Sequence, residues 1–169
     1  GTPLVEGQAL LQLGRYEEAM ASFREALARA DAGERPHVLH EMGVAALDHG
    51  AYPEAEEHLR ALVREEGYPY LAQAYADLAE ALYRQGRYQE AEAAAREAVA
   101  RGAVAAGELV LGHVAYDLLH LEEALEHYRK AAESAEEGSR EWVGAQEMVV
   151  DTLAQLGYRF PEEMVRRGQ

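Results

Sequence analysis

Apolar and small side chains recur three and four residues apart along the chain, and glycines interrupt this pattern at regular intervals. After Gly14, for example, Ala19, Phe23 and Ala26 follow one another at these spacings. Such spacing places the side chains on one face of a helix, and glycine ends a helix readily because it adopts left-handed backbone geometry. The pattern predicts paired helices at 3–13 and 17–31, 36–49 and 53–66, 70–85 and 89–101, 104–118 and 122–136, and 139–156 and 161–167.

A longer repeat underlies this pattern. The segment GRYEEAMASFREAL at Gly14 recurs as GAYPEAEEHLRAL at Gly50 and GRYQEAEAAAREAV at Gly86, and more loosely as LHLEEALEHYRKAA at Leu119. The spacings are 36, 36 and 33 residues, and periods of this size are typical of stacked structural units. We therefore expect one domain over residues 1–169, with units at about 3–31, 36–66, 70–101 and 104–136 and a divergent capping pair at 139–167.

Aligned units share residue types at fixed positions. A small residue lies in the middle of each first helix: Gly7, Gly43, Ala79 and Gly112. An aromatic residue or leucine follows the turn: Tyr16, Tyr52, Tyr88 and Leu121. An alanine and then a bulkier position occupy each second helix: Ala19 and Phe23, Ala55 and Leu59, Ala91 and Ala95, Ala124 and Tyr128. These units resemble the tetratricopeptide repeat (TPR) of bacterial type, which implies an all-α fold, a right-handed α-α superhelix of antiparallel helix pairs.

The small and bulky positions have a packing interpretation. A glycine or alanine allows the two helices of a unit to approach to about 8–10 Å between axes, and the bulky residue fills the space beside it. Ala95 is an exception in the third unit, where we expect a hole unless Tyr75 or Tyr83 fills it. The repeat spacings also predict longer connections around Ala32–Arg35 and Glu66–Pro69.

Composition narrows the classes of partner. The formal charge of −15 and pI near 4.8 disfavour binding to nucleic acid or to an anionic membrane. The chain has no cysteine, which favours the cytoplasm as the default compartment, and the absence of asparagine would suit a heat-adapted protein. Much of the charge forms i, i+4 pairs typical of a solvated helix face: Glu25–Arg29, Glu56–Arg60, Glu92–Arg96, Glu97–Arg101 and Glu126–Lys130.

The resemblance to TPR proteins implies that the first helix of each unit lines a concave groove that binds an extended or helical peptide. The positions that match the groove are His37, His40, Val44, Leu47, Asp48, Gln73, Ala76, Glu80, Tyr83, Arg84, Leu109, His113, Tyr116, Asp117, Glu147 and Asp151. Because this set is rich in carboxylates, rings and aliphatic side chains, it favours a basic or amphipathic protein segment as partner. It lacks the lysine and asparagine residues with which chaperone-binding members hold a C-terminal carboxylate.

Other chemistry has weaker support. His37 and His40 have the spacing of half a zinc site, but the remaining ligands are not evident. Together with His113, they could also make the groove sensitive to protons. The sequence contains no phosphate-binding glycine loop, no HExxH motif and no nucleophile elbow. We therefore expect no enzyme activity, no metal and no cofactor.

Two alternatives to a peptide-binding scaffold remain open at this point. The ends of a helical stack can keep apolar surface, and Val5, Val149 or Val150 could support self-association into a homo-oligomer. The repeats could also be the regulatory part of a longer protein. Neither alternative changes the expected fold.

Overall fold

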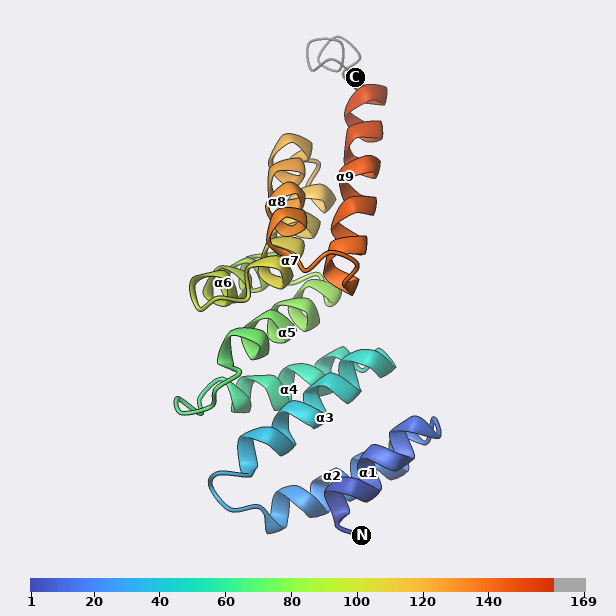
Figure 1. Ribbon diagram of the computed structural model, residues 1–169, viewed down its shortest axis with the longest axis vertical. Helices are drawn as coiled ribbons and strands as arrows, with labels where there is room; N and C mark the ends of the chain where they lie inside the picture. Colours follow the sequence, from blue (N-terminus) through green and yellow to red (C-terminus); the bar gives the residue numbers. More distant parts are fainter. Residues whose placement is uncertain (160–169) are drawn as a thin grey trace.

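The computed structural model describes residues 1–159 and shows a stack of helices, with side chains described up to residue 157. All regular elements in that range are helical: α1 (Pro3–Gln12), α2 (Tyr16–Arg29), α3 (Arg35–His49), α4 (Tyr52–Leu62), α5 (Leu71–Arg84), α6 (Tyr88–Ala100), α7 (Val104–Asp117), α8 (Leu121–Ser134) and α9 (Arg140–Arg159). Consecutive helices pair, and the pairs change direction progressively from α1 at one end to α9 at the other (Figure 1). The fold is an all-α helical-repeat superhelix, as predicted.

The turn within each unit contains one residue in the left-handed backbone conformation. Gly14, Gly50 and Gly86 have φ between 75° and 83°, a region that glycine adopts without steric cost. In the fourth unit Leu119 takes the same role with φ 63°. A leucine in this conformation costs roughly 1–2 kcal/mol, so the turn geometry of the repeat is retained there against the preference of the residue.

The predicted packing of small against bulky positions is confirmed in three units. A Cβ atom built on Gly43 would lie 2.6 Å from Leu59, and one built on Gly112 would lie 2.5 Å from Tyr128. The first unit repeats this contact with Phe23. Because real Cβ atoms do not approach other atoms this closely, a larger residue at these positions would force the partner side chain or the helix to shift.

The third unit avoids a hole in a different way from that expected. Ala95 is fully buried, and α7 approaches it directly: a Cβ on Gly107 would lie 2.8 Å from the Ala95 carbonyl and 2.6 Å from Val99. Tyr83 packs at the side of this core. Tyr75 does not fill the space, because its ring lies under the Arg101 guanidinium, 4.9 Å from ring centroid to Cζ.

Two helix boundaries differ from the predictions by more than two residues. Helix α4 ends at Leu62 rather than 66, which leaves a long connection, 63–70, before α5. Helix α9 continues through Gly157 to Arg159, so the predicted end at 156 is wrong. The buried Leu156 packs with Leu121 and Leu125 of α8, which favours continuation of the helix at that point. The predicted helix 161–167 lies outside the described residues.

Candidate functional site

A groove of about 600 Å³ crosses the first helices of three consecutive units and reaches the start of α9. Its lining combines aliphatic, acidic and basic side chains. The residues are Val44, Leu47, Asp48 and Tyr52, then Gln73, Ala76, Asp77, Glu80 and Arg84, then Ala106, Leu109, Val110 and His113, and finally Arg140, Glu141 and Gly144.

The structure brings together about half of the residues that the sequence suggested for the groove. Those that line it are Val44, Leu47, Asp48, Gln73, Ala76, Glu80, Arg84, Leu109 and His113. The groove lining excludes His37, His40, Tyr83, Tyr116, Asp117, Glu147 and Asp151. It includes residues that sequence reasoning missed: Tyr52, Asp77, Ala106, Val110, Arg140, Glu141 and Gly144.

Some of the missed residues had a signal in the sequence. Asp77 lies one helical turn before Glu80 and one turn after Gln73, so helix periodicity alone would place it on the same face. Arg140 and Glu141 were harder to find, because the cap does not continue the repeat pattern. The first turn of α9 faces the groove, whereas Glu147 and Asp151 lie one and two turns beyond.

The carboxylates of the groove are only partly neutralised. Glu80 accepts a hydrogen bond from Arg84 Nε at 2.7 Å, and this contact raises the pKa of the arginine. Asp77 accepts from Gln73 at 2.9 Å and lies 2.7 Å from His40 Nε2. No ion pair joins Asp48 or Glu141 to another residue of the described chain. The groove therefore keeps available negative charge.

His113 forms part of the groove wall and also contacts the core. Its Nδ1 lies 2.7 Å from the hydroxyl of the fully buried Tyr128, and its ring stacks on Tyr83 with centroids 5.4 Å apart. Burial lowers the pKa of His113, with smaller opposing effects from Glu80 and Asp117. The imidazole is therefore neutral near pH 7 and adds no cation to the groove.

Several side chains that were predicted to line the groove instead form contacts between consecutive units. Tyr88 of α6 donates to Asp117 at 2.8 Å, and Tyr116 of α7 donates to Asp151 at 2.6 Å. Tyr83 stacks on Tyr88 with centroids 5.9 Å apart. The bonded residues are 29 and 35 positions apart in sequence, so replacing the tyrosines would disturb the stack as well as the binding of a ligand.

The half-site for zinc is not completed by neighbouring residues. His40 contacts Tyr68 at Nδ1 and Asp77 at Nε2, so both of its ring nitrogens are engaged. Across residues 1–159, no three His, Cys, Asp or Glu side chains converge in the manner of metal ligands. Within the same range, no helix is long and apolar enough to cross a membrane.

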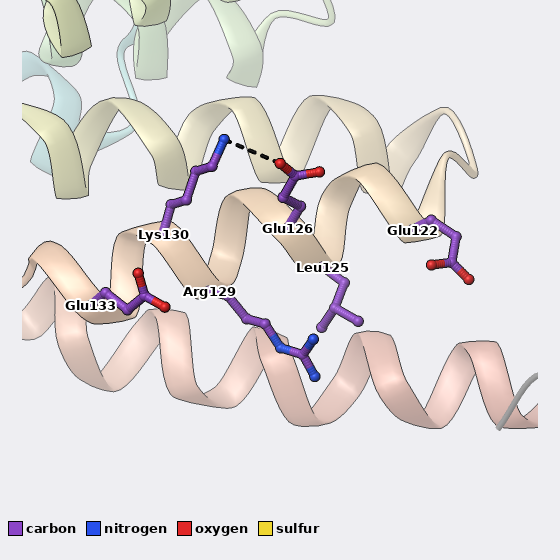
Figure 2. A pocket seen from close by; sticks show the side chains of 6 residues that line it. All are labelled: Glu122, Leu125, Glu126, Arg129, Lys130 and Glu133. Atoms are coloured by element: carbon purple, nitrogen blue, oxygen red, sulfur yellow. Dashed lines mark ion pairs between the residues drawn. The ribbon is translucent and has the colours of Figure 1, made fainter. Parts of the chain in front are cut away.

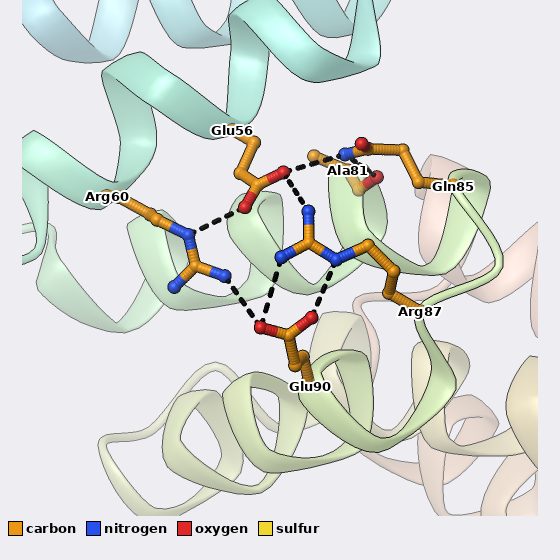
Figure 3. Close-up of polar contacts among 6 residues, drawn as sticks. All are labelled: Glu56, Arg60, Ala81, Gln85, Arg87 and Glu90. Carbon is orange, nitrogen blue, oxygen red and sulfur yellow. Dashed lines mark hydrogen bonds and ion pairs between the residues drawn. The ribbon is translucent and has the colours of Figure 1, made fainter.

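All five predicted i, i+4 pairs are present, at distances of 2.7–3.2 Å. One of them belongs to a larger cluster, the α4–α6 network (Figure 3). In this network Glu56 receives hydrogen bonds from Arg60, Gln85 and Arg87, and Glu90 contacts both arginines. Burial opposes ionisation of Glu56, but the three donors outweigh it and lower its pKa. Here each carboxylate is matched by a guanidinium.

A second recess, on α8, differs from the groove in its lining. Figure 2 shows its described side chains along one helix, with Leu125 and Arg129 directed toward α9 and Lys130 paired with Glu126 at 3.2 Å. Five of the six described lining residues are charged: Glu122, Glu126, Arg129, Lys130 and Glu133. Leu125 alone is apolar, so these residues offer a partner less aliphatic surface than the groove.

Comparisons with known proteins agree with the repeat pattern. Sequence profiles described as tetratricopeptide repeat match residues 5–32 and 40–106, together more than half of the chain. The chain belongs to the tetratricopeptide repeat family. Repeats of this family commonly mediate protein–protein interactions and are generally scaffolds rather than enzymes. The comparison with curated proteins found no match.

Solved structures show the same fold at low identity. PilF of Pseudomonas aeruginosa matches with a TM-score of 0.70 and 15% identity over 94% of this chain and 75% of its own. BtubC (BKLC) from P. vanneervenii matches with a TM-score of 0.76 and 17% identity, over 95% and 74%. MamA matches with a TM-score of 0.67 and 22% identity, over 94% and 93%. At these identities the similarity establishes the fold alone.

Proposed function

We propose that this protein is a scaffold or adaptor whose groove binds an extended or helical segment of a protein partner, basic or amphipathic in character. The observation that carries the proposal is the groove itself, a continuous recess of about 600 Å³ lined by α3, α5, α7 and α9 and by Tyr52 of α4. Solvent reaches both its aliphatic side chains and its carboxylates, so both can contact a ligand.

Aliphatic side chains give the groove its capacity to bind apolar groups. Val44 is 37% exposed, and Leu47 and Leu109 are half-buried. Burial of their remaining apolar surface by a partner would contribute about 25 cal/mol per Å². These three residues come from α3 and α7, on either side of α5. A partner segment that contacts all of them must therefore extend across three consecutive units.

Charge gives the groove its preference among amphipathic segments. Asp48 and Glu141 lie on the first and last helices of the lining and have no ion-pair partner in residues 1–159. A lysine or arginine of the partner would be drawn to these carboxylates, and the net charge of −15 would accelerate the encounter. Binding should accordingly weaken as salt screens the charges.

A peptide-selection experiment tests the proposal. A random displayed library is selected on the wild type, and the recovered peptides are measured against Asp48→Lys/Glu141→Lys and against a matched control, Glu57→Lys/Glu133→Lys, which changes the net charge equally on exposed positions of α4 and α8. We expect peptides that combine lysine or arginine with aliphatic residues. The groove variant should bind them at least about tenfold more weakly and the control within about twofold. Equal losses in both variants would mean that only the overall charge matters.

A second candidate, self-association, is favoured by apolar side chains at both ends of the stack. Val5 and Leu13 of α1 are 56% and 69% exposed, and Val143 and Val150 of α9 are 43% and 68% exposed. Contact between such ends would bury this surface in a homo-oligomer. Light scattering over a wide concentration range tests this: a mass that increases with concentration and is reduced by Val150→Asp supports the candidate, and a constant monomer mass excludes it.

A further inference from the structure

Three aromatic rings form a cluster, here called the aromatic corner, at the N-terminal ends of α3 and α5. Its members are His37 on α3 and Tyr68 and Tyr70 in the connection before α5. Their ring centroids lie 5.1, 6.5 and 5.6 Å apart, and their planes stand at 80°, 70° and 72° to one another. None of the three lines the groove.

The rings differ in exposure in a way that suits a binding site. Tyr68 is 6% exposed and forms the base of the cluster, whereas Tyr70 is 58% exposed and His37 is also exposed. Tyr70 and His37 keep exposed ring surface beside the buried Tyr68, and cations bind to the negative π faces of aromatic rings. We propose that the aromatic corner binds a cationic head group, the guanidinium or methylated ammonium of an arginine or lysine side chain in a protein partner.

Hydrogen bonds hold the base of the corner in place. The Tyr68 hydroxyl lies 2.5 Å from His40 Nδ1, and His40 Nε2 lies 2.7 Å from Asp77. With Asp77 accepting a hydrogen bond from Nε2–H, Nδ1 accepts a hydrogen bond from the Tyr68 hydroxyl. Gln73 donates to the other oxygen of Asp77 at 2.9 Å. Because the Tyr68 ring is already fixed in this way, binding of a ligand does not have to order it. The entropy cost of binding is therefore smaller and the affinity is higher.

The electrostatic field at the corner also favours a cation. Burial, the neighbouring Tyr70 and the charges of Asp77 and Glu41 together raise the pKa of Tyr68 to about 12. Both carboxylates are therefore near enough to make the potential at its ring more negative. Arg35, two residues before His37 in the sequence, forms an ion pair with Glu65 at 3.5 Å.

Two tyrosines elsewhere in the chain already have the guanidinium group of an arginine over their rings. Arg101 lies 4.9 Å from the ring centroid of Tyr75, and Arg84 lies 6.0 Å from that of Tyr52. In the described part of the chain, no arginine or lysine lies over the rings of the aromatic corner. The corner thus has the ring type and the charge for such a contact, while its cation must come from another molecule.

Titration by NMR with small probes tests the inference at pH 7.5. The cationic probes are Nα-acetyl-arginine amide and Nα-acetyl-trimethyllysine amide, and the neutral controls of similar shape are the citrulline and norleucine analogues. We expect both cations to shift the ring signals of Tyr68, Tyr70 and His37, and the neutral analogues to leave them unchanged. The tighter of the two cations identifies the head group.

Substitution of the exposed ring completes the test. Tyr70→Leu should weaken binding of the cation about three- to fivefold, and Tyr70→Phe should preserve it, because the π face and not the hydroxyl makes the contact. Circular dichroism confirms that both variants are folded. Equal shifts with the neutral analogues, or unchanged affinity in Tyr70→Leu, would overturn the inference.

These experiments can overturn the proposal for the groove and the proposal for the aromatic corner separately. Asp48→Lys/Glu141→Lys alters the groove and leaves the rings of the corner intact, so we expect it to bind the small cations within about twofold of the wild type. A loss there as large as that of Tyr70→Leu would show that general attraction to an acidic surface accounts for the shifts.

Discussion

The groove and the α4–α6 network are built from the same charged residue types, yet they differ in how much charge they leave available. In the network Glu56 is 13% exposed and is bonded to Arg60, Arg87 and Gln85. In the groove Arg84 is paired with Glu80, whereas Asp48 and Glu141 have no ion-pair partner within residues 1–159. The same composition therefore stabilises the stack in one region and leaves a surface for a ligand in the other.

This difference explains why net charge alone is a poor guide to binding. A charge of −15 describes the whole chain, but carboxylates that are already bonded to arginine attract little further cation. Only those without a cationic partner contribute strongly to a local potential. Variants of each region should accordingly separate into those that change stability and those that change binding.

The largest effect on stability is expected in the network. Glu56→Gln removes the charge that holds two guanidinium groups, and we expect a loss of about 1–2 kcal/mol in the free energy of unfolding, measured with urea. The control Glu92→Gln breaks an exposed i, i+4 pair with Arg96 and should cost at most about 0.5 kcal/mol.

The same pair of variants predicts a dependence on pH. Because the folded-state pKa of Glu56 is lowered, its contribution is fully present above the unfolded-state value and is lost as the pH falls through the folded value. The difference between wild type and Glu56→Gln should thus diminish in acid. A cost for Glu56→Gln no larger than that of Glu92→Gln at pH 7 would contradict the account.

A smaller effect is expected from the polar contacts beneath the aromatic corner. Tyr68→Phe removes the hydroxyl that contacts His40, and we expect the free energy of unfolding to fall by about 1 kcal/mol. The matched change Tyr70→Phe affects an exposed ring and should be neutral. Equal stabilities of the two variants would show that the hydrogen bond from Tyr68 contributes nothing.

The pH dependence of stability tests whether His113, in the wall of the groove, is buried as described. Burial lowers its pKa in the folded protein, so below the ordinary value of about 6.5 the unfolded chain binds more protons and stability falls. His113→Gln removes this contribution, and its melting temperature should decline less than that of the wild type between pH 7.5 and 5.5. Parallel declines would mean that His113 titrates normally.

The smallest effect on stability is expected from the groove carboxylates. Asp48→Lys replaces an exposed side chain without an ion-pair partner in the described chain, so its free energy of unfolding should stay within about 0.5 kcal/mol of the wild type. Thermal unfolding measures this. A larger loss of stability would show that Asp48 has a structural role. Another groove carboxylate would then have to be replaced in the binding experiment.

Sequence periodicity predicted the parts of the molecule that follow the repeat. The glycine turns and the contact of Gly43 with Leu59 recur with the unit, so each unit predicts the corresponding feature of the next. The resemblance to TPR proteins implied the groove positions on α3, α5 and α7, and about half of the suggested residues line the groove. One of the two helix boundaries that differ, the end of α9, lies in the cap, where the repeat is weakest. Gly157 resembles the glycine of a turn, but the contacts of Leu156 with α8 keep α9 helical there.

The remaining features depend on contacts between units that the repeat does not encode. Gly107 fits closely against the Ala95 carbonyl and Val99, a contact between α6 and α7 that the repeated positions do not predict. Tyr68 and Tyr70 lie in a connection without periodicity, and their meeting with His37 depends on the path of the loop. The resemblance to TPR proteins implied that His37 lines the groove, but it could not show which rings would cover that end of the helix.

The location of a bound peptide tests the central claim most directly. Methyl NMR spectra of the wild type would be recorded with a selected basic, amphipathic peptide, using Val44, Leu47 and Leu109 as reporters of the groove and Val5, Leu13 and Val150 as reporters of the ends. We expect shifts at the groove methyls that vanish in Asp48→Lys/Glu141→Lys and persist in Glu57→Lys/Glu133→Lys. Shifts confined to the end methyls would contradict a groove-binding scaffold and favour association through the ends of the stack.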